Sequence, residues 1–266
     1  MSKIGSVFSN SGRKALITYF TVGYPDMDAT LEMARLAADA GSDLIELGIP
    51  FSDPLADGST IQQASHRSLE QGTTPESCLE LARRLREEVD VPLVFMTYFN
   101  PVHSYGQEAF CRDCAEAGLD GLIVPDLPPE EGAELEALSH SQGLDLVYLL
   151  APTSTDERID IVAARSRGFI YLVSLTGVTG SRDSLPAELE SFVMRVRRKA
   201  RQPLCVGFGI STPEQARRVA DVADGVIVGS RIMQLLDEDE PAAGVRGFIQ
   251  SLRRALDDHN ENRAGN

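Results

Sequence analysis

A single glutamate interrupts the apolar segment Asp43–Ile49, whose composition is typical of a buried strand. Because successive side chains of a strand point to opposite faces, Glu46 shares its face with Leu44 and Gly48. Inside an apolar core a carboxyl group is desolvated, which raises its pKa and suits it to proton transfer. The segment therefore predicts a general acid or base at Glu46, although a buried glutamate satisfied by hydrogen bonds would leave the same pattern.

The loop that follows, Pro50–Gly58, carries two further acids, Asp53 and Asp57. Asp57 precedes a glycine and an expected helix start at Ser59, so a turn or capping role fits its position as well as a chemical one. The two aspartates and Glu46 together offer the oxygen ligands that Mg²⁺ prefers. The spacing gives such a metal site little support, and we expect no bound metal.

Glycine-rich turns follow the last three expected strands, at Gly177–Gly180, Gly207–Ser211 and Gly229–Ser230. Glycine allows backbone N–H groups to approach an anion closely. In α/β barrels the loops after the last strands, with the start of a short extra helix, frequently bind phosphate. One such turn is common, but three in succession predict a phosphorylated small-molecule substrate.

The expected strands carry no lysine for Schiff-base catalysis, and the histidines and cysteines do not form a metal-binding pattern. The three lysines, Lys3, Lys14 and Lys199, lie outside the expected strands, which excludes Schiff-base catalysis on a strand. The four histidines are scattered, and the Cys111–Cys114 pair lies in an expected helix without a second pair, which disfavours zinc. What remains is carboxylate acid–base chemistry on a substrate that supplies its own electron sink.

The elements that must position these residues alternate between short β-rich segments and amphipathic helical ones. The expected strands are Leu16–Val22, Asp43–Ile49, Leu93–Tyr98, Gly121–Val124, Leu146–Leu150, Phe169–Ser174, Leu204–Phe208 and Val226–Gly229. Eight such strands, each followed by a helix, predict an α/β fold, a (β/α)8 TIM barrel forming one domain over 1–266. We expect an extra N-terminal helix and a frayed polar end at 257–266. The competing doubly wound sheet keeps its phosphate loop at the first strand.

The charge and composition of the chain restrict the classes of partner that it can bind and the compartment expected for it. Acidic residues outnumber basic ones by 40 to 25, and the net charge of −15 argues against a general nucleic-acid or anionic-membrane binder. The N-terminus lacks the apolar stretch of a signal peptide, and no apolar run is long enough to span a bilayer. Four cysteines in a chain of 266 residues do not suggest a disulfide scaffold. We therefore expect a cytoplasmic protein.

Seven motifs, in family order along nearly the whole chain, resemble the tryptophan synthase α subunit family. They are Phe20–Pro25, Ile45–Gln62, Met96–Pro101, Val124–Pro128, Ser174–Gly180, Gly207–Ser211 and Val228–Ser230. The resemblance implies a carbon–carbon lyase of tryptophan biosynthesis that splits indole-3-glycerol phosphate into indole and glyceraldehyde 3-phosphate. Ser59 departs from the proline that many members carry there, but this change removes no chemical group.

The resemblance also implies roles for individual residues. Glu46 matches the family's catalytic acid/base, Asp57 matches the carboxylate that hydrogen-bonds the indole N–H, and Tyr171 matches a tyrosine beside the reacting centre. The matching substrate-binding positions are Tyr19, Ile61, Met96, Tyr98, Asp126, Thr179, Gly180, Phe208, Gly209, Gly229 and Ser230. The loops at Phe51–Gly58 and about Gly177–Pro186 are implied to close over the substrate.

The same resemblance implies an α2β2 heterotetramer, in which indole passes through a tunnel to a β subunit that holds pyridoxal phosphate. This chain itself is implied to hold no cofactor. Asp53, Pro54 and the segment Asn100–Gly106 match the side that faces the partner. The alternatives are a stand-alone indole-3-glycerol-phosphate lyase, a non-catalytic phosphate-binding regulatory partner, and another phosphate-binding barrel such as an epimerase or isomerase.

Overall fold

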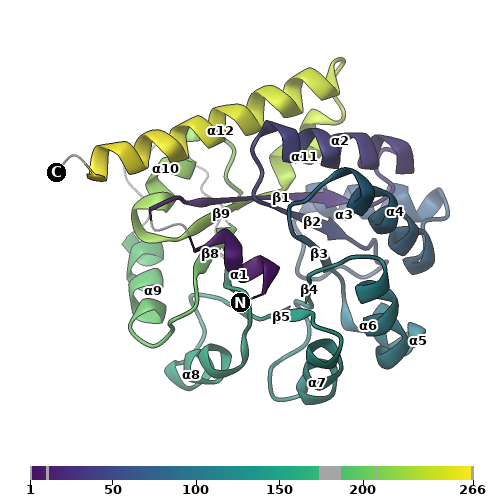
Figure 1. The fold of residues 1–266 in the computed structure, drawn as a ribbon, viewed down its shortest axis with the longest axis horizontal. Helices are drawn as coiled ribbons and strands as arrows, with labels where there is room; N and C mark the ends of the chain where they lie inside the picture. Colours follow the sequence, from purple (N-terminus) through teal and green to yellow (C-terminus); the bar gives the residue numbers. More distant parts are fainter. Residues whose placement is uncertain (1, 10–11, 174–186, 208, 265–266) are drawn as a thin grey trace.

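Parallel strands ringed by helices make up the fold (Figure 1). The computed structural model describes residues 2–9, 12–173, 187–207 and 209–264. In this part of the chain the strands are β1 (Ala15–Thr21), β2 (Leu44–Gly48), β3 (Leu93–Met96), β4 (Gly121–Ile123), β5 (Asp145–Val147), β6 (Leu149–Leu150), β7 (Ile170–Val173), β8 (Leu204–Gly207) and β9 (Gly225–Val228). Every pairing between them is parallel, so the strands end together at one rim of a nearly closed barrel, and the expected barrel fold is confirmed.

The fifth expected strand, Leu146–Leu150, is divided into β5 and β6 at Tyr148. The strand order is β5-β4-β3-β2-β1-β9-β8-β7-β6, so β5 pairs with β4 while β6 pairs with β7. The Tyr148 carbonyl accepts a hydrogen bond from Tyr171 N at 3.1 Å, and its own N–H donates to the Ser166 hydroxyl. One continuous segment therefore connects the two ends of the sheet. Because this segment forms two short strands, the described residues contain nine strands where the sequence pattern predicts eight.

Helices surround the barrel and cross one of its ends (Figure 1). They are α1 (Lys3–Val7), α2 (Met27–Ala40), α3 (Ser59–Glu70), α4 (Pro75–Glu88), α5 (Phe99–Tyr105), α6 (Gln107–Glu116), α7 (Ala133–Ser141), α8 (Asp156–Arg165), α9 (Ala187–Arg197), α10 (Pro213–Val222), α11 (Ser230–Leu235) and α12 (Pro241–Ala264). Thr74 and Thr212 cap α4 and α10 ahead of a proline, and Gly41 ends α2 with a φ of 113°. Among the described residues, no helix combines the length and apolar character that a membrane crossing needs. The fraying expected at 257–266 stays a prediction.

Two apolar clusters separate the inside of the barrel from its outer layer. Leu44 packs in the interior cluster, whereas Ile45 and Leu47 pack in the cluster under the helices, as the alternation in β2 predicts. The expected N-terminal helix is α1, which lies across one end of the barrel in Figure 1. Its fully buried Ile4 belongs to the interior cluster, so α1 closes the end of the barrel opposite the strand C-termini.

Candidate active site

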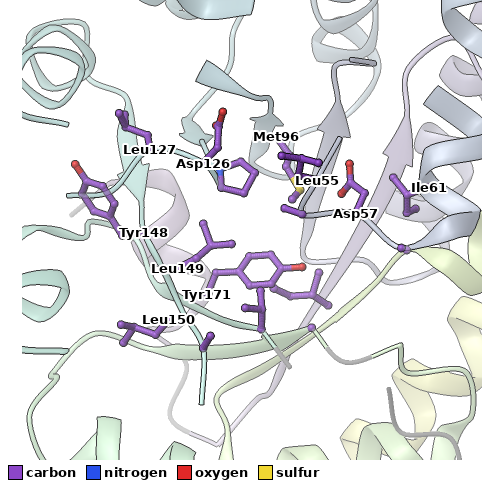
Figure 2. Close-up of a pocket in the computed structure, with 18 of the residues that line it drawn as sticks. Leu55, Asp57, Ile61, Met96, Asp126, Leu127, Tyr148, Leu149, Leu150 and Tyr171 are labelled. Carbon is purple, nitrogen blue, oxygen red and sulfur yellow. The ribbon is translucent and has the colours of Figure 1, made fainter. Parts of the chain in front are cut away.

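A cavity of about 730 Å³ opens at the C-terminal ends of the strands. That volume lies in the range of pockets that enclose small-molecule substrates. Residues from β1, β3, β6, β7, β8 and β9 line it, together with residues of the loops that follow β2, β4, β6, β8 and β9 and of the helices α3, α8 and α11 beyond them (Figure 2). The rim at which barrel enzymes carry out their chemistry therefore holds the candidate active site.

Glu46 lies in the middle of β2 and is completely buried. Neither carboxyl oxygen has a hydrogen-bond partner in the described part of the chain, and burial raises the pKa of Glu46 from its ordinary 4.5 to about 8. At neutral pH the group is therefore mostly protonated. Glu46 is not among the residues that line the cavity, whereas Tyr19 and Tyr171 are. When ionised, Glu46 contributes to the raised pKa values of both tyrosines.

Asp57 projects from the loop between β2 and α3 and lines the cavity wall (Figure 2). Burial raises the pKa of Asp57 to about 6, and a hydrogen bond from Tyr98 limits the rise. The Tyr98 hydroxyl donates to Asp57 Oδ2 at 3.1 Å. Tyr98 itself is not part of the cavity lining and lies behind Asp57. The site thus holds one carboxyl that is mostly protonated and one that is mostly ionised at neutral pH, a division suited to acid–base work.

Two tyrosines cross the barrel interior and pack against glycines on neighbouring strands. A Cβ atom at Gly48 would lie 2.0 Å from the Tyr19 hydroxyl, and one at Gly207 would lie 2.5 Å from the Tyr171 hydroxyl. The two rings fit only because β2 and β8 carry no side chain at these points. Burial, aided by the nearby carboxylates, raises the pKa of both phenols well above the ordinary value, so both stay neutral.

Within the described residues, four members of the expected phosphate-binding turns line the cavity: Gly207, Gly209, Gly229 and Ser230. Gly209 has a φ of 62°, in the left-handed region that favours glycine. An added Cβ at Gly229 would meet the Tyr19 ring at 3.1 Å. Backbone groups are therefore accessible along this wall. Thr179, Gly180 and Phe208 lie outside the described residues.

The remaining expected positions are also brought together. Ile61, Met96 and Asp126 line the cavity, and Asp126 Oδ1 accepts a hydrogen bond from Phe99 N at the start of α5. Sequence reasoning missed several lining residues: Leu55, Ala56, Leu127, Pro128, Tyr148, Leu149, Val173 and Ile227. The lining position of Leu149 could have been predicted, because Leu149 and Val147 alternate onto the same face of the expected fifth strand. In the structure Leu149 pairs in register with Tyr171.

The carboxylates do not form a metal centre in the part of the chain that the structure describes. No group of three or more His, Cys, Asp or Glu side chains gathers there. Asp53 is exposed and accepts a hydrogen bond from the neighbouring Ser52 hydroxyl at 2.6 Å, whereas Glu46 is enclosed by the barrel. Asp53 is therefore exposed while Glu46 is enclosed, and these surroundings do not support a magnesium site formed by Glu46, Asp53 and Asp57.

The chain is similar to known proteins over nearly its whole length. A family model described as "Tryptophan synthase alpha chain" matches residues 7–259. A curated protein of that name from Dehalococcoides mccartyi is 57% identical over 97% of this chain and 100% of its own length, and one from Geobacter sp. is 49% identical over 96% and 98%.

Solved structures of the same family share the fold. The tryptophan synthase subunit alpha of Legionella pneumophila superposes with a TM-score of 0.90 at 34% identity, covering 97% of this chain and 99% of that one. A chain of the aminoacrylate-bound tryptophan synthase of M. tuberculosis gives a TM-score of 0.88 at 36% identity, covering 96% and 100%. The chain therefore belongs to the tryptophan synthase alpha chain family, lyases that cleave indole-3-glycerol phosphate in tryptophan biosynthesis.

Proposed function

We propose that this chain cleaves indole-3-glycerol phosphate with Glu46 as general acid and base and with Asp57 as the carboxylate that stabilises the indole ring. The observation that carries this proposal is the buried Glu46 carboxyl, which has no partner among the described residues and a pKa raised to about 8. An unpaired carboxyl in a barrel core is costly to keep, and a role in proton transfer accounts for it.

The protonated state of Glu46 sets the order of steps. As an acid it gives its proton to C3 of the indole ring, which becomes positively charged at its nitrogen. The carboxylate left behind then removes the proton from the hydroxyl on the glycerol carbon that is bonded to the ring. The O–H electron pair forms the aldehyde C=O, the carbon–carbon bond breaks, and its electron pair neutralises the ring. Indole and glyceraldehyde 3-phosphate leave, and Glu46 is again protonated.

Asp57 and Tyr171 support this sequence from the cavity wall. An ionised Asp57 accepts the indole N–H and stabilises the positive charge on the ring in a site of low polarity. The neutral Tyr171 hydroxyl lies beside the charge of Glu46 and lines the cavity. Since Tyr19 and Tyr171 line the cavity above Glu46, the glutamate side chain turns between them to reach the substrate.

The other expected binding residues enclose the rest of the substrate. Backbone N–H groups at Gly209, Gly229 and Ser230, with the Ser230 hydroxyl, hold the phosphate without needing a cationic side chain. Phe208, Thr179 and Gly180 are expected to complete this cradle. Ile61, Met96 and Tyr19 pack against the ring, Asp126 contributes to the cavity wall, and Tyr98 supports that wall from behind.

The partner and compartment also belong to this proposal. We expect the chain to hold no cofactor and to pass indole to a β subunit that carries pyridoxal phosphate, in an α2β2 complex in the cytoplasm. Leu55 is 93% exposed and follows Asp53 and Pro54, the residues that match the family's partner-facing side. An exposed leucine of this kind suits an interface that a partner covers.

The test is a steady-state assay of indole release from indole-3-glycerol phosphate, with the β subunit as the variable. We expect release that rises on addition of the β subunit and is abolished by Glu46→Gln. Full activity of the chain alone would indicate a stand-alone lyase. An unchanged rate in Glu46→Gln would contradict the catalytic role of Glu46. Phosphate-ligand binding without any indole release would instead indicate a regulatory binding protein.

A further inference from the structure

Tyr98 makes three contacts with the loop between β2 and α3. Its hydroxyl oxygen accepts a hydrogen bond from Ala56 N at 2.9 Å, and its O–H donates to Asp57 Oδ2 at 3.1 Å. Its ring packs against Phe51 with 5.2 Å between centroids. The three contacts involve Phe51, the first residue of the loop Phe51–Gly58, and Ala56 and Asp57, which directly precede its last residue. One side chain thus links the whole loop to the barrel rim.

The position of Tyr98 is itself fixed by the fold. The residue is buried, follows β3, and directly precedes α5. The next residue, Phe99, donates its N–H to Asp126 Oδ1 at 2.8 Å, which joins this segment to the loop after β4. The tyrosine therefore projects from a rigid part of the barrel toward a loop that has no regular secondary structure.

The two oxygens of the Asp57 carboxylate have different hydrogen-bond environments. Tyr98 occupies Oδ2, and among the described residues no second side chain donates to this carboxylate. The backbone of Asp57 is tethered separately, because Gln62 Nε2 donates to its carbonyl oxygen at 2.9 Å. An incoming N–H donor in the cavity therefore meets the remaining oxygen, Oδ1, held in one orientation.

We propose that Tyr98 is a positioning residue: its hydroxyl fixes the Asp57 carboxylate toward the substrate's ring N–H and holds the loop Phe51–Gly58 on the rim in the ligand-free chain. The proposal rests on the role proposed above for Asp57. It differs from a wall contact with the substrate, since Tyr98 lies behind the loop and is not part of the cavity lining. Loss of the hydroxyl alone should then affect the loop and the carboxylate together.

The groups around Asp57 predict how the pH dependence of activity should change when the Tyr98 hydroxyl is removed. The titratable groups that interact with Asp57 are Tyr98 behind it, Tyr19 from β1 and Tyr171 from β7. Asp126 and Arg158 are the other charged residues that line the same cavity in the described part of the chain. Among these, the Tyr98 hydrogen bond is the contact that lowers the pKa of Asp57 against the effect of burial. Removing that bond raises the pKa of Asp57 further above about 6, so ionisation then requires a higher pH.

The decisive variant is Tyr98→Phe in the full-length chain with its β subunit, assayed for indole release from about pH 5 to about pH 9. The ring contact with Phe51 is retained and only the hydroxyl is lost. We expect kcat/KM to fall about tenfold near pH 6 and less at high pH, because a hydrogen bond to a charged group is removed. The acidic limb of the profile should move to higher pH. An unmoved limb would overturn the proposal.

Two matched variants separate positioning from general damage. Tyr24→Phe removes another tyrosine–aspartate hydrogen bond, from Tyr24 to Asp237. Neither residue lines the cavity, so this variant should leave the profile unchanged. Phe51→Leu removes the ring contact but keeps the hydroxyl, so its acidic limb should stay where it is in the unmodified chain. A limb that moves equally in all three variants would contradict a specific role for Tyr98.

Amide hydrogen exchange on the ligand-free chain tests the tether without the reaction. In Tyr98→Phe the amide of Ala56 loses its acceptor, and its exchange should quicken by about tenfold or more, while Tyr24→Phe should not change it. Equal exchange at Ala56 in the two variants would overturn the tether. If Asp57 has no role in the reaction, Asp57→Asn should leave the rate of indole release unchanged, while exchange at Ala56 in Tyr98→Phe should still quicken. This pattern distinguishes failure of the proposed function from failure of the tether.

Discussion

Glu46→Gln is expected to make the protein more stable while it removes activity. The buried carboxyl has no partner among the described residues, and its pKa rises from 4.5 to about 8 on folding. Below about pH 4.5 the group is neutral in both states and folding carries no ionisation cost. As the pH rises above that value, the unfolded chain ionises first, so stability is lost progressively until the folded-state pKa is passed.

The size of this cost follows from the pKa difference. One pKa unit corresponds to about 1.4 kcal/mol, so ionisation of Glu46 lowers the free energy of unfolding by roughly 3 kcal/mol at about pH 7 and by roughly 5 kcal/mol above about pH 8. Glutamine has the same shape and no charge at any pH. The variant should therefore match the unmodified chain near pH 4.5 and exceed it by these amounts at higher pH.

Urea unfolding followed by circular dichroism across about pH 5 to about pH 9 measures the difference directly. Asp53→Asn, at an exposed acid in the next loop, is the control and should show no growing gap. In parallel, indole release should fall by about 10² to 10⁴ in Glu46→Gln, the usual contribution of a general acid or base. A stability gap that does not widen with pH would refute the reasoning, because the carboxyl would then be stabilised by contacts that the structure lacks.

Three further outcomes follow from the described geometry. Asp57→Asn should lower kcat/KM by about 10² and remove the rise in activity near pH 6; a pH–rate profile that keeps that rise would assign it to another group. Gly48→Ala places a Cβ 2.0 Å from the Tyr19 hydroxyl. It should lower stability by about 1 to 3 kcal/mol and raise KM, as measured by urea unfolding and steady-state kinetics, and unchanged values would show that the ring moves freely. Ile4→Ala, in the cluster that closes the far end of the barrel, should cost about 2 to 5 kcal/mol with kcat/KM unchanged, and a loss of activity at full folding would contradict that separation.

Much of the fold follows from local pattern. The alternation in Asp43–Ile49 placed Glu46 inside and Ile45 outside, and both positions are confirmed because a strand with a period of two has only that choice of face. Threonine–proline pairs gave the starts of α4 and α10 for an equally local reason: proline at the first helical turn loses no hydrogen bond.

The missed features are set by contacts distant in sequence. The division of the fifth strand at Tyr148 arises because its two halves pair with different neighbours, β4 and β7, which its own residues do not encode. The hydrogen bond from Tyr98 to Asp57 depends on how the segment before α5 packs against the loop Phe51–Gly58, which neither segment encodes alone. The roles of the individual site residues stay predictions.

The two tyrosine–glycine contacts tie together positions on adjacent strands. Since the Tyr19 ring fills the space that Gly48 leaves vacant, and Tyr171 does the same beside Gly207, neither partner can change size independently. A family evolving a differently shaped cavity would have to exchange bulk within each pair in one step, or pass through an overpacked or hollow intermediate. The floor of this site is therefore more readily reshaped by paired substitutions on neighbouring strands than by any single one.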